Sequence, residues 1–111
     1  MDSNEEDKQR WEEELARLKQ EMEEEKANVE FLQTGAFNAL EKTLLRDIEK
    51  NLNVLYNNGK PAISEEEVNS ANSAKVEIRV RKEFLRRMTE SPSRLQLLSE
   101  DYEELKNRGG I

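Results

Sequence analysis

Four basic side chains recur at spacings of four, three and four residues in the second half of the chain: Lys75, Arg79, Lys82 and Arg86. On an α-helix these spacings place all four on one face, because residues three or four positions apart lie about one turn from each other. Such a basic stripe contacts nucleic-acid phosphates, or it forms a solvated face that balances acidic segments. Residues 75–94 hold 7 bases and 3 acids, whereas residues 1–30 hold 5 bases and 12 acids. The charge balance within the chain favours the second role, and nucleic-acid binding remains the alternative.

Three runs of glutamate, at residues 12–14, 23–25 and 65–67, are the other concentrations of charge. Consecutive residues of a helix point in different directions, so these carboxylates do not converge on one cation. The chain has no histidine and no cysteine, which removes the commonest general base and the thiolate nucleophile. It also has no glycine-rich phosphate loop. We therefore expect a protein without catalytic activity, bound metal or cofactor.

An apolar stripe with a seven-residue period extends from Trp11 to Ala39. With Leu15 at heptad position a, positions a and d hold Trp11, Leu15, Leu18, Met22, Glu25, Val29, Leu32, Ala36 and Ala39. Eight of these nine residues are apolar, and Glu25 alone interrupts the pattern. A stripe this narrow, called the seam below, is typical of a coiled coil rather than of a broad globular core. The residues expected to bind a partner helix are Trp11, Leu15, Leu18, Met22, Val29 and Leu32.

Charged residues flank the seam in a pattern that favours two parallel copies. Glu14 and Glu21 occupy position g, and Lys19 and Lys26 occupy the following position e. In a parallel dimer, position g of one helix faces the next position e of the other helix, so both contacts would be attractive. These four residues would then set the orientation of the helices. The alternative is that this helix folds back on the C-terminal helices of its own chain.

The seam requires a long helix that starts near residue 4. Gly35 is expected to kink or break this helix, because glycine costs about 1 kcal/mol relative to alanine in a helix interior. Beyond Gly35 the apolar face becomes broad enough to bury in a compact core. The segment 57–63 predicts a turn, because Asn58 or Gly59 can adopt the left-handed conformation and Pro61 cannot extend the helix.

The next helix has a clear start signal. Ser64 followed by Glu67 forms a capping-box pattern, and Ile63 with Val68 forms a hydrophobic-staple pattern. The alternation of apolar and charged residues in segment 75–81 would fit an edge strand, but the start signal upstream favours a helix that ends before Ser91 and Pro92.

The predicted fold is therefore all-α: a long N-terminal coiled-coil-like helix, a helical hairpin and a short C-terminal helix. We place an acidic arm at residues 1–35 and a small helical domain at residues 36–111, with a closing helix at residues 94–107. Apolar residues are expected to pack across the hairpin, with Ile78, Leu85 and Met88 against Ile48, Leu52 and Leu55.

The arm, the segments 37–48 and 81–88 and the run 65–67 together resemble small helical proteins of tailed bacteriophages. The resemblance implies a multi-copy component of a virion or of its assembly, and it carries over no site residue. No apolar run approaches the roughly 20 residues of a membrane span, so we expect a soluble protein of the cytoplasm or of a virion.

The function expected from these features is non-catalytic: the protein oligomerises with itself or docks on the helices of a larger assembly. Two alternatives use other features of the chain. The first is a nucleic-acid-binding module that uses the basic stripe. The second is a regulator or chaperone that holds a helix of one partner protein.

Overall fold

A computed structural model describes residues 3–109 of the protein, and every regular element in this range is helical. The elements are α1 (Ser3–Leu32), α2 (Gly35–Leu55), the short 3-10 helix η1 (Asn57–Gly59), α3 (Glu65–Thr89) and α4 (Ser91–Arg108). This confirms the all-α prediction and the long N-terminal helix. The segment 75–81 lies inside α3, so the alternative of an edge strand is wrong.

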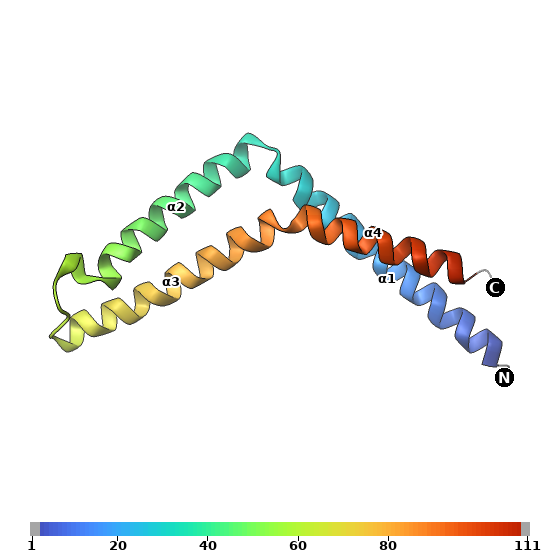
Figure 1. Ribbon diagram of the computed structural model, residues 1–111, viewed down its shortest axis with the longest axis horizontal. Helices are drawn as coiled ribbons and strands as arrows, with labels where there is room; N and C mark the ends of the chain where they lie inside the picture. The colour runs from blue at the N-terminus through green and yellow to red at the C-terminus, as the bar shows by residue number, and fades with distance from the viewer. Residues whose placement is uncertain (1–2, 110–111) are drawn as a thin grey trace. The chain divides into compact units, whose positions relative to one another are not determined.

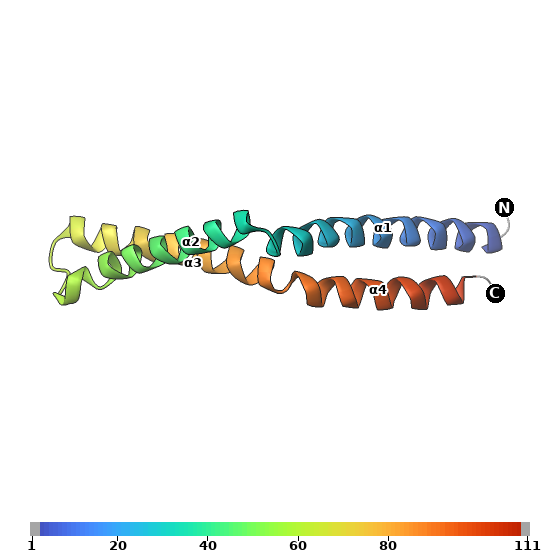
Figure 2. The ribbon, with the colours of Figure 1, turned by 90° about the horizontal axis from the view of Figure 1, so that it is seen from above.

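The helices form two compact units, each of them a pair of helices (Figures 1 and 2). The terminal unit joins residues 3–31, which lie in α1, to residues 90–109, which contain α4. The middle unit comprises residues 32–89 and contains α2 and α3. The predicted division placed the last helix with the hairpin, whereas the structure places it with the N-terminal arm. The chain divides after Phe31 and again after Thr89, whereas the prediction placed a single boundary after residue 35.

The break between α1 and α2 occurs at Gln33 and Thr34, as expected from Gly35, but a side-chain cap produces the new start. The Thr34 hydroxyl accepts a hydrogen bond of 3.2 Å from the backbone N–H of Phe37. This bond satisfies one of the free N–H groups at the beginning of α2, which is the usual role of threonine at an N-cap. Gly35 is the first residue of the new helix.

The core of the middle unit lies between α2 and α3, which run antiparallel in Figure 1. Its buried apolar side chains are Phe37, Ile48, Ala74 and Ile78. The prediction placed Ile48 and Ile78 in this core correctly. It was wrong to pair Leu85 with Leu52, because Leu85 lies about 30 Å along α3 from the turn at a rise of about 1.5 Å per residue. Leu52 lies in the last turn of α2, next to the loop.

The same argument applies to the other residues of the predicted packing. Met88 lies one residue before the end of α3, and Leu55 ends α2 beside the turn. In an antiparallel pair, these two residues are at opposite ends of the hairpin. Both are half-buried.

The turn of the hairpin is built from three consecutive residues with positive φ, at Asn57 (48°), Asn58 (55°) and Gly59 (83°). Asparagine and glycine tolerate this left-handed conformation better than other residues do. The left-handed conformation predicted for Asn58 or Gly59 is present at both residues, but it begins one position earlier, at Asn57, which directly follows the cap residue Tyr56. The Asn57 side-chain amide also donates a hydrogen bond to the Glu67 carboxylate, which ties the turn to the start of α3.

The start of α3 shows the Ser64 half of the predicted capping box, whereas the Glu67 carboxylate accepts its hydrogen bond from the Ser64 hydroxyl and not from the Ser64 backbone N–H. The Ser64 hydroxyl accepts a hydrogen bond of 3.0 Å from the backbone N–H of Glu67, and it lies 3.0 Å from the carboxylate of the same residue. The predicted hydrophobic staple is wrong, because the Ile63 side chain is 88% exposed and does not pack on Val68.

The last helix begins earlier than predicted, at Ser91 rather than at residue 94. Pro92 lies in the first turn of α4, where its missing N–H leaves no hydrogen bond unmade. The sequence suggested a stop at this proline, but proline at this position begins a helix as readily as it ends one. α4 ends at Arg108, one residue beyond the predicted end.

Candidate helix-docking site

The seam of α1 lies against α4 of the same chain. Among residues 4–32 of α1, Leu18 is the one buried side chain, at 6% exposure. The other predicted partner-binding residues in this helix are half-buried: Trp11, Leu15, Met22, Val29 and Leu32. The structure therefore agrees with the alternative in which α1 folds back on its own chain, and α4 covers only part of the seam.

The predicted seam ends at Leu32, because α1 ends there. Ala36 and Ala39 lie in α2, beyond the break, and both are exposed. In the first two turns of α2 the apolar residues that are buried or half-buried are instead Phe37 and Leu40. The heptad register therefore does not continue through Thr34 and Gly35.

Trp11 fixes one end of the terminal unit. Its indole Nε1–H donates a hydrogen bond of 2.7 Å to the backbone carbonyl of Leu105, in the last turn of α4. Gly109 lies against the same ring, and a methyl group added at Gly109 would overlap the indole. The same carbonyl also accepts a hydrogen bond of 3.1 Å from the backbone N–H of Gly109, so the indole N–H is its second donor.

Glu25, the one charged residue of the seam, is paired across the terminal unit. The Arg94 guanidinium Nε lies 3.0 Å from a carboxylate oxygen of Glu25, whose side chain is 17% exposed. A polar pair inside an otherwise apolar helix contact favours a single register, because a shift along the helix would leave the charge buried without a partner. The position that interrupts the heptad pattern therefore fixes how α1 and α4 align.

The acidic residues expected to set the orientation of two copies are paired within α1. Arg17 bridges the carboxylates of Glu14 and Glu21, and its distance to Glu21 is 2.7 Å. The hydrogen bond and the positive charge of Arg17 hold the pKa of the Glu14 carboxyl below its ordinary value. The predicted partners of these acids in a second copy, Lys19 and Lys26, are exposed.

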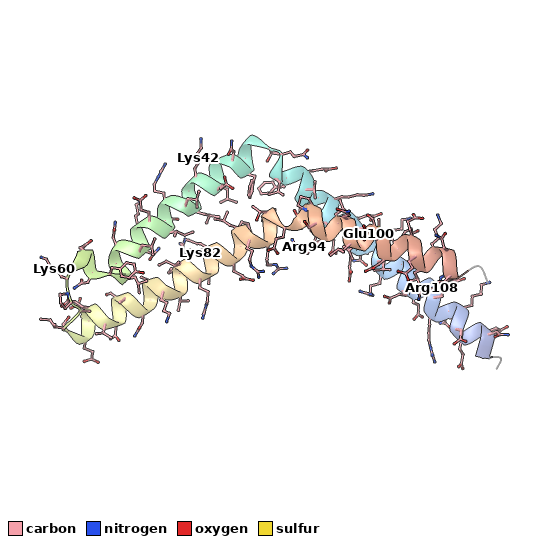
Figure 3. All side chains as sticks on the ribbon, in the orientation of Figure 1. Lys42, Lys60, Lys82, Arg94, Glu100 and Arg108 are labelled. Atoms are coloured by element: carbon pink, nitrogen blue, oxygen red, sulfur yellow. The ribbon has the colours of Figure 1, made fainter. Side chains whose placement is uncertain are left out.

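The basic stripe lies on one face of α3, as the spacing predicted. All four of its residues are exposed, and Lys82 is labelled in Figure 3. They line a shallow groove along the helix, and the buried Ile78 contributes to the same groove. Arg86 is paired with Glu83 at 2.5 Å. In the described part of the chain, no ion pair involves Lys75, Arg79 or Lys82.

Two negative findings concern the described residues only. Between residues 3 and 109, no three acidic side chains come together where a metal ion could be held. None of the helices in the same range combines the length and the apolar composition needed to cross a membrane.

Comparison of the chain with protein-family models, with curated proteins and with solved structures finds no match. The contacts of the two helix pairs are thus the basis for assigning a role to this protein.

Three contacts of the site were not predicted from the sequence. The acceptor for Trp11 is a backbone carbonyl, which every residue has, so no side-chain pattern points to it. Arg94 is 69 positions away from Glu25, and no local spacing joins them. Arg17 carried a usable signal, since it lies three residues after Glu14 and four before Glu21, which are the spacings of helical ion pairs.

Proposed function

We propose that this protein is a non-catalytic helical docking component of a larger assembly, in which the terminal unit presents its partly covered seam to further helices. One observation carries the proposal. Leu15, Met22 and Val29 keep part of their surface exposed although α4 lies against α1. A pair of helices covers only one side of such a seam, and burial of the rest by another helix is favourable by about 25 cal/mol per Å² of apolar surface.

The sequence resemblance supports a sharper form of this proposal, in which the assembly is a phage virion or an intermediate in its formation. A protein present in many copies there would meet either further copies of itself or the helices of neighbouring components. In both cases the half-buried residues of α1 supply the apolar contact.

The test is the solution mass, measured by light scattering at about 0.5 M NaCl so that contacts between exposed charges are screened. Wild type is compared with a Leu15→Glu, Met22→Glu double variant. The control is Gln9→Glu, Gln20→Glu, which adds the same charge at exposed positions of α1. Far-UV circular dichroism checks that each variant stays helical.

A mass above the 13.0 kDa of one chain that falls to the monomer value only in the seam variant supports self-association through the seam. A monomeric wild type would remove self-association through the seam from the proposal. The heterologous form then requires a 1:1 complex with a partner helix, which the same seam variant must abolish.

Nucleic-acid binding remains a second candidate, because Lys75, Arg79 and Lys82 are exposed and lack ion pairs within the described residues. Basic side chains in a row neutralise phosphates, and their binding weakens as salt increases. Fluorescence anisotropy with labelled duplex DNA and single-stranded RNA at about 50 mM NaCl tests it. No change in anisotropy at this salt concentration would eliminate the candidate.

A further inference from the structure

Most arginines of this protein have a carboxylate partner close at hand. Arg17 pairs with Glu14 and Glu21 one turn away, Arg94 with Glu25, and Arg108 with Glu104. Lys75, Arg79 and Lys82 of the basic stripe are exposed and take part in no ion pair between residues 3 and 109, a property that they share with Arg10, Arg46 and the other lysines of this range. This face of α3 therefore carries positive charge that the described structure leaves without a partner.

A face of opposite charge exists on α1, on the side away from the seam. Glu12, Glu23 and Glu24 are exposed, and no ion pair in the described range involves them. Ala16 and Ala27 are exposed on the same outer side, since a helical period of 3.6 residues places both opposite Leu18. Small residues between glutamates allow another helix to approach closely.

The two faces also match in spacing and in apolar content. Lys75 and Lys82 are seven residues apart, as are Glu23 and Glu30, which is also exposed on the outer side of α1, so each pair spans about 10.5 Å on a helix. Val76, one turn before Arg79 on α3, is 46% exposed. Its side chain, directed at an exposed alanine, adds an apolar contact beside the two rows of opposite charge.

We propose that the basic stripe of α3 in one copy docks on the outer acidic face of α1 in a second copy. The inference rests on the proposed docking function, and it identifies the docking partner as a second copy of the same chain. A second copy is favoured because one chain supplies both faces, with net charges of opposite sign on residues 1–30 and 75–94. The overall charge of −7 opposes binding to a polyanion such as nucleic acid.

The strength of this contact depends mainly on charge. Two single helix faces offer less than the roughly 800 Å² per partner of a standard interface. Exposed charges separated by more than about 10 Å are largely screened at 0.1 M salt, so association through these faces weakens steeply as salt rises. This salt dependence separates the contact from the apolar seam, whose association persists at high salt.

The experiment is sedimentation velocity at about 50 mM and about 0.5 M NaCl. The stripe variant is Lys75→Glu, Arg79→Glu, Lys82→Glu. The matched control is Lys42→Glu, Arg46→Glu, Lys50→Glu, which reverses three exposed bases on α2 of the same unit. Each triple reversal changes the net charge by 3 × (−2) = −6, from −7 to −13, so the two variants differ only in where the charge is placed.

Wild type and control are expected to show a weight-average mass at least about twofold above 13.0 kDa at low salt, and the stripe variant about the monomer mass. The variant Glu12→Lys, Glu23→Lys, Glu24→Lys should also be monomeric alone. A mixture of this α1 variant with the stripe variant restores attraction and should recover the higher mass. Circular dichroism confirms that each remains helical.

Three results would overturn the inference. The first is a wild type that has the monomer mass at low salt, and the second is a stripe variant that associates as well as the control does. The third is a stripe that binds DNA or RNA while wild type stays monomeric, which would assign this face to nucleic acid. Loss of only the salt-sensitive association leaves the seam proposal standing, because the seam is tested at about 0.5 M NaCl.

Discussion

The two helix pairs of this protein are held together in different ways. The middle pair buries the apolar side chains Phe37, Ile48, Ala74 and Ile78, and its helices are joined by the short segment 56–64. The terminal pair brings together helices from opposite ends of the chain, and its buried side chains in the described range are Leu18 and Ser91. Its alignment depends on two polar contacts, those of Trp11 and of Glu25.

This difference shows how local and distant pairing are specified. Closing a short loop costs little entropy, so a modest apolar core and a well-formed turn are enough for the middle pair. In the sequence, α1 and α4 are separated by the whole of the middle unit, residues 32–89. For them, few contacts must select one register, and specific polar contacts exclude the alternatives that a uniform apolar seam would allow.

The largest effect is expected in the middle core. Ile78→Ala removes buried methyl groups from a side chain that is 7% exposed, and it should lower the free energy of unfolding by about 2–4 kcal/mol. Ile63→Ala is the matched control, since Ile63 is 88% exposed and its replacement should change stability by less than about 0.5 kcal/mol. Urea denaturation followed by circular dichroism measures both. Equal losses would mean that Ile78 is not part of the core.

The stability of the terminal pair should decrease when one methyl group is added at Gly109. Gly109→Ala forces the indole of Trp11 to move, which should cost about 1–3 kcal/mol and break the hydrogen bond to Leu105. Trp11 is the only tryptophan, so its fluorescence reports the change directly as a shift to longer wavelength. Gly35→Ala is the control, because no atom lies within 4 Å of a methyl group added there. If both variants leave the emission unchanged, the contact between Trp11 and Gly109 does not exist.

A smaller effect is expected from the polar contact inside the seam. Glu25→Gln removes one charge of the pair with Arg94, and partly exposed pairs contribute about 0.2–1 kcal/mol. Glu25→Gln should therefore lower the free energy of unfolding by this amount. Exchanging the two residues, Glu25→Arg with Arg94→Glu, should restore part of the lost stability. A double-mutant cycle from thermal unfolding gives the coupling energy, and a coupling of zero would show that this pair does not fix the register.

The smallest effect concerns Glu14 at the surface of α1. Because Arg17 holds the pKa of this carboxyl below its ordinary value, the folded state favours the ionised form. Its contribution to stability is therefore present above the ordinary carboxyl pKa and disappears as the pH falls through the lowered value. An NMR titration should show the lowered pKa in wild type and its return to the ordinary range in Arg17→Gln. The same pKa in both proteins would rule out the contact.

Much of the fold could be predicted because its signals are local. The capping pair Ser64 and Glu67, the turn at Asn58 and Gly59, and the break next to Gly35 each depend on a few adjacent residues. Local patterns were less reliable where one residue allows two outcomes. Pro92 suggested a helix end but occupies a first turn, and Ile63 had the spacing of a staple but remains exposed.

The candidate site was only half predictable. A heptad pattern shows which face of α1 is apolar, but it is the same whether the covering helix comes from a second copy or from the same chain. The sequence therefore located Leu18 on the contact face without identifying α4 as its partner. The charged residues at heptad positions g and e were compatible with a parallel dimer. In the structure, however, Arg17 pairs with both Glu14 and Glu21 within one helix.

In the structure α4 of the same chain covers the seam of α1, and cross-linking tests this contact most directly. The chain has no cysteine, so Glu25→Cys with Arg94→Cys introduces a unique pair at the contact. A short bismaleimide can span helices packed about 8–10 Å apart. The control, Ala16→Cys with Arg94→Cys, places one thiol on the outer side of α1.

We expect the Glu25→Cys, Arg94→Cys protein to give a cross-linked species with the mass of one chain, in equal yield at low and high protein concentration, and the control to give none. A cross-linked dimer whose yield rises with concentration would contradict the account. It would mean that the seam of α1 is covered by α4 of another copy.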